Sequence, residues 1–133
     1  HERSINDILE LSVDEAIAFF EMHARTSPEK KVIQKLMPLQ EVGLGYVTLG
    51  QSSSTLSGGE AQRIKLASFI GKGQSADGGG TFFLFDEPTT GLHVHDIRKL
   101  VASFNKMLEL GHTILVIEHN LEVIKQADWL IDL

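Results

Sequence analysis

Two polar pairs in the second half of the chain carry side chains that could bind a metal ion and a phosphate. Asp86 and Glu87 directly follow one short apolar run, and Glu118 and His119 directly follow another. Ligands of open α/β sheets bind beyond the carboxyl ends of the strands, so we expect these four residues to share one sheet edge. Carboxylate oxygens suit Mg²⁺ or a general base, and an imidazole can donate to a phosphate oxygen. The alternative is that both strands simply end in polar residues.

A third polar segment, Ser57-Gly58-Gly59-Glu60, offers the other half of a phosphate site. Ser57 and Glu60 match the capping-box pattern, which predicts a helix that runs from this point to about Ile70. The two glycines at the start of that helix leave backbone N–H groups accessible to an anion. An ordinary capping box with a flexible entry explains the same four residues without a ligand.

The elements that must position these residues alternate between strand and helix. Short apolar runs predict strands at 81–85 and 113–117, each buried on both faces. An apolar stripe predicts a helix over 95–110, and we expect a further helix over 121–127 and a third strand over 129–133. Strands that alternate with helices pair in parallel through right-handed crossovers, so the fold class of this half is α/β.

The first half of the chain has the pattern of a helical subdomain. The capping box Ser12-Val13-Asp14-Glu15 opens an apolar run and predicts a helix that starts at Val13. Ser27, followed by a proline in the first helical position, predicts a second helix start. Pro38 is expected to kink or restart that second helix.

A polar connector, Gly50–Thr55, separates the two halves. We therefore expect a helical subdomain over residues 1–50 and an α/β part over 51–133, without internal repeats. The five glycines between residues 71 and 80 predict a flexible loop. Trp129 opens an apolar strand and is expected to lie in the core.

The composition limits the classes of protein and of site. The chain has 133 residues, 42% of them hydrophobic, which suits one unit with a sizeable core. Its apolar runs are far shorter than the roughly 20 residues that a membrane-spanning helix needs. It contains no Cys, which excludes thiolate metal ligands within the chain and fits a reducing compartment. Its 18 acidic and 12 basic residues give a net charge of −6, so any contact with DNA is expected to be local.

Four segments, in this order and spacing, resemble the motifs of the ABC-ATPase family. They correspond to its signature, its Walker B strand, its D-loop and its switch histidine: Leu56–Arg63, Phe82–Pro88, Thr89–His93 and Ile117–Asn120. The resemblance implies an incomplete P-loop NTPase core of the ABC type, with parallel strands. It also implies that the N-terminal half is the helical signature subdomain.

A closer resemblance is to the A subunit of the bacterial excision nuclease of nucleotide excision repair, in its second, C-terminal ATPase module. The segments that carry it are Val42–Tyr46, Leu49–Gln51, Gly91–His93 and Ala127–Leu133. The D-loop ends in a histidine, as in this subfamily, whereas transporter ATPases usually have an aspartate there. The resemblance covers essentially the whole chain and is weakest over residues 22–35.

One hallmark of the family, the Walker A loop, does not occur in the sequence. There is no G-x-x-x-x-G-K-[ST] pattern, and Gly71-Lys72-Gly73 is no substitute because the residue five positions before Gly71 is Leu66 and a glycine follows the lysine. The chain begins with His and continues with polar residues, so we expect no signal peptide and interpret it as a fragment. By resemblance, the phosphate-gripping lysine, the Q-loop and the cysteine-bearing zinc modules lie outside it. We therefore expect the isolated chain to be inactive and to bind no zinc.

The resemblance implies ATP and Mg²⁺ as cofactors of the whole protein. Asp86 would hold Mg²⁺ through water, Glu87 would polarise the attacking water, and His119 would contact the γ-phosphate. The remaining expected nucleotide-binding residues belong to the signature and the D-loop: Ser57, Gly58, Gly59, Glu60, Gly91 and His93. The first three of these would cap the γ-phosphate of a nucleotide held by the Walker A loop of another module, so catalysis would need a composite site.

The function that the resemblance implies is an ATP-driven DNA-damage sensor of nucleotide excision repair. Its expected partners are DNA, a second ATPase module or subunit, and other excision-repair subunits, in the cytoplasm and away from membranes. One alternative is a subunit of another ABC system, such as a transporter. A second is a non-catalytic helical interaction module, which nucleotide-independent binding of a partner by residues 1–50 would favour.

Two further groups of residues have a functional and a plainer interpretation. The tract His93–Asp96 has metal-binding residue types, but histidines two apart at a helix start point in different directions, and a D-loop with a helix cap explains it better. Four basic residues on one predicted helix could contact DNA or form a solvated face: Arg25, Lys30, Lys31 and Lys35.

Overall fold

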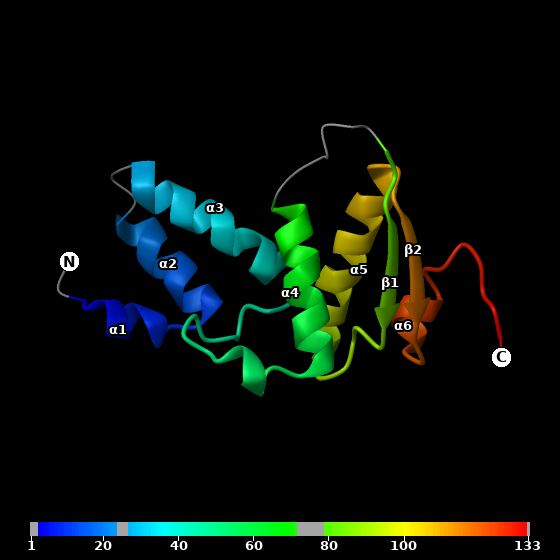
Figure 1. Cartoon of the computed structure of the whole chain (residues 1–133), viewed down its shortest axis with the longest axis horizontal. Coiled ribbons are helices and arrows are strands. Elements are labelled where there is room, and N and C mark those ends of the chain that lie inside the picture. Colours follow the sequence, from blue (N-terminus) through cyan, green and yellow to red (C-terminus); the bar gives the residue numbers. More distant parts are fainter. Residues whose placement is uncertain (1–2, 24–26, 72–78, 133) are drawn as a thin grey trace.

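The computed structural model describes residues 3–23, 27–71 and 79–132. The elements, in chain order, are α1 (Ile5–Leu9), α2 (Val13–His23), α3 (Ser27–Glu41), the short 3-10 helix η1 (Ser53–Thr55), α4 (Gly58–Ile70), β1 (Phe82–Asp86), α5 (Val94–Glu109), β2 (Thr113–Ile117) and α6 (Leu121–Ile124). Figure 1 shows α1 to α3 at one end of the molecule, the two strands towards the other, and α4 and α5 between them. The predicted mixture of helices with a small parallel sheet is confirmed.

The two strands form a parallel sheet, as predicted. Their register runs from Phe82 opposite Thr113 to Asp86 opposite Ile117. The intervening helix α5 packs on the sheet, where the ring of Phe104 lies 5.0 Å from that of Phe85. This pairing places the ends of both strands, and the polar residues that follow them, at one edge.

The prediction that both faces of the strands are buried is wrong. Side chains alternate along a strand, and Phe85 is 5% exposed on the face that α4 and α5 cover. The other face carries Phe82 and Leu84, which are 63% and 60% exposed, beside the exposed Leu115 and Ile117. Within the described residues, only one side of the sheet has helices packed on it. The apolar side chains on the other side are therefore exposed, although the sequence predicted that they would be buried.

The predicted third strand is also absent from the described part of the chain. Residues 129–132 have no strand structure, and residue 133 lies outside the described ranges. The sheet has two strands, and none is available beside this segment to pair with its backbone N–H and C=O groups. Trp129 is therefore 90% exposed rather than part of the core, and the helix expected over 121–127 ends at Ile124.

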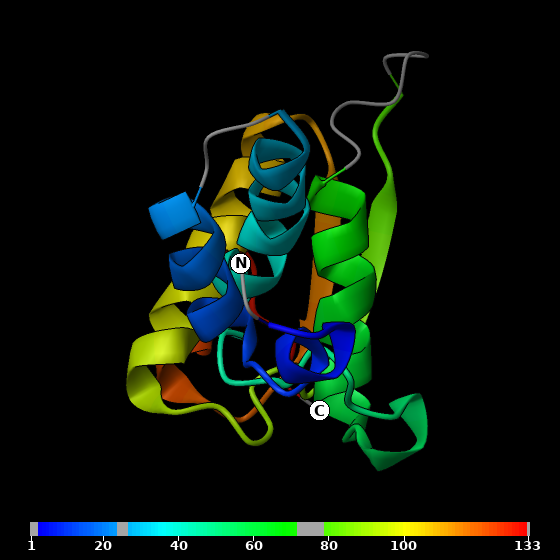
Figure 2. The ribbon, with the colours of Figure 1, turned by 90° about the vertical axis from the view of Figure 1, so that its left-hand side faces the viewer.

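The helices of the first half begin where the capping patterns predict. Glu15 accepts a hydrogen bond from the backbone N–H of Ser12 at 2.8 Å, and α2 starts at Val13. Helix α3 starts at Ser27 and is continuous through the buried Pro38, so the helix does not restart there. Helices α2 and α3 lie side by side (Figures 1 and 2).

The hydrophobic core draws on both halves of the chain. Its buried members are Val42, Leu44, Val47, Leu66, Ala67, Phe85, Leu100, Phe104 and Met107. The first three precede the polar connector and the others follow it, so one core spans the boundary that we place at residue 50. That division into subdomains stays a prediction. Most of the predicted loop at 71–80, and Arg25, lie outside the described residues.

None of the helices within residues 3–23, 27–71 and 79–132 combines the length and the apolar character that crossing a membrane requires.

Candidate functional site

The carboxyl end of the sheet brings Glu87 and His119 together. The Nδ1 atom of His119 lies 3.8 Å from Oε1 of Glu87, and both side chains are largely exposed. The parallel register causes this meeting, because Asp86 and Ile117 end their strands side by side. The expectation that the polar residues after both strands share one edge is confirmed. A carboxylate and an imidazole at this separation, both open to solvent, could act on the same small ligand.

The backbone at Glu87 has an unusual conformation. Its φ is 45°, and among the described residues it is the one non-glycine residue with a positive φ. This left-handed region is unfavourable for a residue with a Cβ and costs about 1–3 kcal/mol. Hydrogen bonds hold the turn, since the N–H of Glu87 donates to the carbonyl of Ile117 at 2.9 Å and its carbonyl accepts from the N–H of Thr90 at 3.1 Å. Strain at an exposed carboxylate is typical of a functional position.

The carboxylate of Glu118 accepts hydrogen bonds from the loop after β1 and from the loop after β2. Its Oε1 accepts hydrogen bonds from the N–H of Thr89 at 2.9 Å and from its hydroxyl at 2.5 Å. Its Oε2 accepts from the N–H groups of His119 and Asn120 at 3.0 and 3.1 Å. Burial raises the pKa of Glu118, but these hydrogen bonds outweigh burial and hold the pKa below its ordinary value. Of the four polar residues expected at the edge, Glu118 holds the turns that carry Glu87 and His119.

Asp86 has the exposure that a water-mediated Mg²⁺ site needs. Its backbone is bonded to Gln62, while the residue itself is exposed at the end of β1. A single carboxylate beside Glu87 fits Mg²⁺, which keeps most of its waters and takes one or two protein oxygens. The described residues contain no cluster of three or more potential metal ligands. The role of Asp86 therefore stays a prediction.

The signature segment forms the predicted capping box at the start of α4. The hydroxyl of Ser57 accepts from the N–H of Glu60 at 3.2 Å, and Glu60 accepts from the N–H of Ser57 at 2.7 Å. A Cβ added at Gly58 would meet nothing within 4 Å, so the N-terminal face of the helix is open there. An open helix N-terminus suits an anion, although ligand binding by Ser57, Gly58, Gly59 and Glu60 stays a prediction.

Tyr46 makes a hydrogen bond to Glu60 that the sequence did not lead us to expect. Its hydroxyl donates to Oε1 of Glu60 at 2.6 Å. This hydrogen bond, followed by those from Ser57, holds the pKa of Glu60 below its ordinary value. Burial and the neighbouring Glu60 raise the pKa of Tyr46. Both carboxylate oxygens of Glu60 are thus engaged within the chain, and the tyrosine ties the loop after α3 to the start of α4.

Helix α4 packs directly on the turn that carries Glu87. A Cβ on Gly59 would lie 3.2 Å from the carbonyl oxygen of Thr90, so a larger residue would fit only if the turn moved by a few tenths of an ångström. Gln62 and the fully buried Arg63 also bond to this turn, and sequence reasoning gave neither a role. The available signal was their place in the signature segment, next to Gly59 and Glu60.

The segment that resembles a D-loop ends at His93, which caps the N-terminus of α5. Gly91 has φ 78°, a left-handed conformation that glycine adopts without strain. His93 is the N-cap residue of α5, and its ring Nδ1 accepts from the N–H of His95 at 3.5 Å. Asp96 pairs with Lys99 at 3.1 Å. The cap interpretation of residues 93–96 is consistent with these contacts, and nucleotide contact by Gly91 and His93 stays a prediction.

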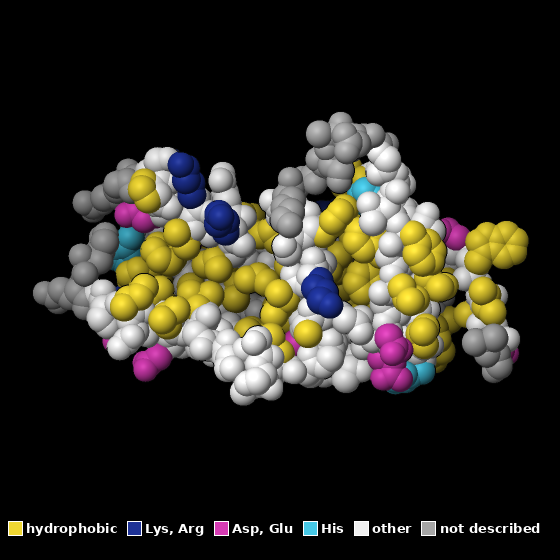
Figure 3. Space-filling model, in the orientation of Figure 1, with side chains coloured by type: hydrophobic (Ala, Val, Ile, Leu, Met, Phe, Trp, Pro, Cys, Tyr) yellow, Lys and Arg dark blue, Asp and Glu magenta, His cyan; other side chains and the backbone are white. Residues whose placement is uncertain are grey.

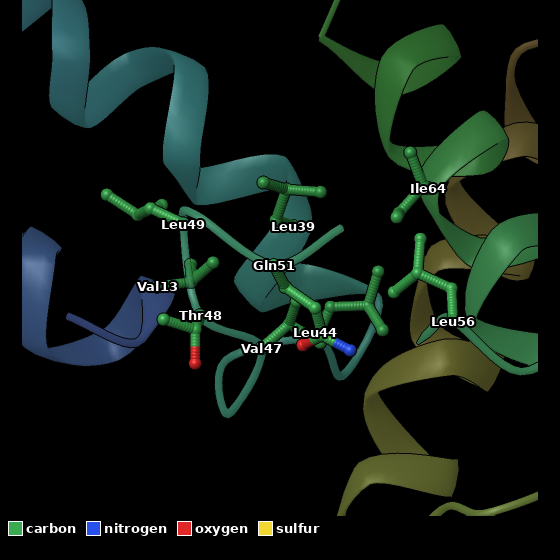
Figure 4. Close-up of a pocket in the computed structure, with 9 residues that line it drawn as sticks. All are labelled: Val13, Leu39, Leu44, Val47, Thr48, Leu49, Gln51, Leu56 and Ile64. Atoms are coloured by element: carbon green, nitrogen blue, oxygen red, sulfur yellow. The ribbon is translucent and has the colours of Figure 1, made fainter. Parts of the chain in front are cut away.

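A separate cavity of about 170 Å³ lies between α2, α3 and α4. Figure 4 shows the residues that line it, which are mostly apolar: Val13, Leu39, Leu44, Val47, Thr48, Leu49, Gln51, Leu56 and Ile64. Neither Glu87 nor His119 contributes to this lining. The cavity is therefore distinct from the polar site at the sheet edge.

Comparison with known proteins gives one consistent result. No protein-family model matches the chain. It is 52% identical over 131 residues to UvrABC system protein A of Lactiplantibacillus plantarum and to that of Aquifex aeolicus, and 50% identical to that of Bacillus subtilis. Each match covers 98% of this chain and 13% of the relative, so the chain spans about an eighth of the length of these curated relatives.

A solved structure agrees with the sequence matches. The crystal structure of UvrA2 from Deinococcus radiodurans superposes with a TM-score of 0.74 at 40% identity, over 97% of this chain and 15% of that one. The resemblance noted from the motifs is thereby confirmed over nearly every residue. At this identity along almost its whole length, the chain matches one segment of the longer UvrA proteins.

Proposed function

We propose that this chain is part of an ABC-type ATPase that couples ATP binding and hydrolysis to the recognition of DNA damage in nucleotide excision repair. The observation that carries the proposal is the meeting of Glu87 and His119 at the carboxyl end of a parallel sheet. The open N-terminus of α4, which packs against the same turn, adds a surface for phosphate. The identity to UvrA proteins supplies the choice of repair over transport.

The proposed chemistry assigns one task to each exposed group. Mg·ATP, when bound, supplies the phosphoryl group and a cation that spreads the developing charge. Asp86 holds the cation through water, Glu87 orients and polarises the attacking water, and His119 donates a hydrogen bond to the γ-phosphate. The backbone at Ser57–Gly59 caps a γ-phosphate held by the Walker A loop of another module.

The proposed architecture places this segment in the second, C-terminal ATPase module. Residues 1–50 would be the helical signature subdomain, and residues 51–133 would be the later part of a P-loop NTPase core of the ABC type. The sequence contains no Walker A loop, so the donors that grip the β- and γ-phosphates must come from elsewhere. The isolated chain should therefore bind ATP only weakly and should not hydrolyse it. Micromolar binding by calorimetry would contradict this expectation.

A contact with DNA is proposed only for one surface. Lys30, Lys31 and Lys35 are exposed on α3, and Figure 3 shows Lys and Arg side chains above this part of the molecule. If they contact phosphates, replacing all three with Gln should weaken DNA binding of the full-length protein equally for all sequences and lower its salt dependence. Unchanged binding would leave α3 as a solvated face. Other repair subunits, and a second ATPase module, are the remaining proposed partners.

The decisive experiment replaces the proposed water-activating group in the full-length protein. Glu87→Gln should lower kcat for ATP hydrolysis by about 10²–10⁴-fold, the usual contribution of a general base, and leave ATP affinity within about twofold. Glu109→Gln is the matched control, because Glu109 is exposed at the C-terminal end of α5, whereas Glu87 lies in the turn that precedes the N-terminal end of this helix. An unchanged kcat in Glu87→Gln would remove Glu87 from the role that we assign to it.

A further inference from the structure

Two successive side chains of α4 hold the backbone on both sides of Glu87. The side-chain amide of Gln62 donates to the carbonyl of Asp86 at 2.9 Å and accepts from its N–H at 3.1 Å. In a parallel pair, the N–H and C=O of one residue point to the same side of the strand, and here they point away from β2. Gln62 therefore takes the place of a neighbouring strand at the last residue of β1.

Arg63 holds the next part of the same turn. Its Nη1 donates to the carbonyls of Pro88 and Thr90, at 2.5 and 3.3 Å. The side chain has no exposed surface, and its Nε and Nη2 atoms have no hydrogen-bond partner among the described residues. Burial lowers the pKa of this guanidinium. An apolar side chain of similar size would often serve stability as well as a buried, incompletely paired charge, so stability alone does not account for an arginine here.

The opposite side of the turn is held by the end of β2. The N–H of Glu87 donates to the carbonyl of Ile117, and Thr89 donates twice to the carboxylate of Glu118. Every residue from 86 to 90 is thus bonded to α4, to the end of β2, or to another residue of the turn. Glu87 lies in the middle of this segment with a φ of 45°. A strained conformation of this kind persists only when its surroundings determine it from several sides.

We propose that Gln62 and Arg63 are positioning residues that keep Glu87 in its strained conformation, with its carboxylate directed towards His119. The proposal rests on the role proposed above for Glu87. It makes the first two turns of α4 and the carboxylate one unit, because Gly59, Gln62 and Arg63 all lie against the segment 86–90. Neither positioning residue needs to touch the nucleotide.

The test is a double-mutant cycle on ATP hydrolysis by the full-length protein. Gln62→Met keeps the length and the helix propensity of the side chain and removes both hydrogen bonds to Asp86. We expect kcat to fall at least about tenfold with the KM for ATP within about twofold, because a misplaced Glu87 affects the transition state and not ground-state binding. In the Glu87→Gln background, measured by single-turnover hydrolysis, the same change should cause no further loss.

Three further variants test this interpretation. Lys65→Met alters the exposed side of α4 and should leave kcat within about twofold of the wild type. Arg63→Met should act as Gln62→Met does, and Arg63→Lys should recover part of the rate because an ammonium group can still donate to Pro88. The cycle with Arg63→Lys also serves if Gln62→Met does not fold, as judged by circular dichroism.

The outcomes separate this proposal from the one on which it rests. An equal loss from Gln62→Met with and without the Glu87 carboxylate would show a general structural effect and overturn the positioning role. An unchanged kcat in Gln62→Met with Glu87 intact would also overturn it. If Glu87→Gln alone leaves kcat unchanged, the failure lies in the role of Glu87 itself, and the positioning proposal falls with it.

Discussion

The same two strands border two regions of opposite character. At their carboxyl ends, the turn over residues 86–90 accepts hydrogen bonds from Gln62 and Arg63 of α4, and Thr89 donates to Glu118 in the loop after β2. On their outer face, and along residues 129–132, apolar side chains lie open to solvent, among them Leu84, Ile117 and Trp129 (Figure 3). The first region has its partners within the chain, whereas the second has none among the described residues.

The difference shows what kind of information a sequence pattern contains. A capping box or a polar residue after a strand specifies partners a few residues away or at the next strand end, and those partners are present. An apolar run specifies only that a surface will be buried, and not which element will bury it. The exposed face and the missing third strand are the places where this second kind of information failed.

The largest expected change in the free energy of unfolding comes from a substitution on the buried face of β1, and the matching substitution on the exposed face should have little effect. Phe85→Ala should lower the free energy of unfolding by about 3–5 kcal/mol, because it opens a cavity beside Phe104 in the core. Phe82→Ala, on the exposed face of the same strand, should change it by less than about 1 kcal/mol. Urea unfolding of the chain, followed by far-UV circular dichroism, measures both. Equal losses would mean that the outer face is covered in solution.

A smaller effect concerns the polar region. Glu118→Gln should destabilise the chain by about 1–3 kcal/mol, because an amide cannot accept from the N–H groups of His119 and Asn120 as the second carboxylate oxygen does. The pKa of Glu118 is lowered on folding, so its contribution is complete above about pH 4.5 and is lost as the pH falls through the folded-state pKa. The gap between wild type and variant should therefore narrow as the pH falls below about 4.5. A gap that is independent of pH would contradict this role of the carboxylate.

Removal of the helix cap should have a more modest effect. Ser57→Ala deletes the acceptor for the N–H of Glu60 and should cost about 1 kcal/mol. Ser68→Ala, at an exposed position within α4, is the control and should be neutral or slightly stabilising. Chemical denaturation of the two variants side by side decides the matter, and a neutral Ser57→Ala would show that the first turn of α4 is held mainly by Tyr46 and the turn over 86–90.

The smallest effect on stability is expected on the open face. Leu84→Lys should change the free energy of unfolding by about 0.5 kcal/mol or less, since Leu84 is 60% exposed. The same change should reduce self-association of the chain, because an exposed apolar face favours burial against another copy and a lysine on that face opposes it. Sedimentation velocity over a range of concentrations measures this effect. A wild-type chain that stays monomeric throughout would show that the open face does not drive association.

Much of the polar site could be predicted from the sequence. The starts of α2, α3 and α4, the parallel pairing of the strands and the meeting of Glu87 with His119 all follow from local patterns and from the geometry of parallel sheets. Each of these depends on contacts within a few residues or on one strand register. The roles proposed for the site residues are still to be tested by the experiments above.

The contacts of Gln62, Arg63 and Tyr46 could not be predicted in the same way. Gln62 reaches a residue 24 positions away, and Arg63 reaches residues 25 and 27 positions away. No periodicity records such a pairing, and the burial of a whole arginine contradicts what its residue type suggests. Only the packing of α4 against the end of β1 reveals it.

The conformation of Glu87 has a consequence for selection. Glycine or asparagine would occupy this left-handed position more comfortably, since the strain at a glutamate costs about 1–3 kcal/mol. If Glu87 has the role proposed above, a screen for thermal stability alone would enrich sequences without the carboxylate at position 87, and those variants would be more stable and inactive. Under that proposal, stability and turnover are opposing demands at this residue, and only a screen that scores both would retain the glutamate.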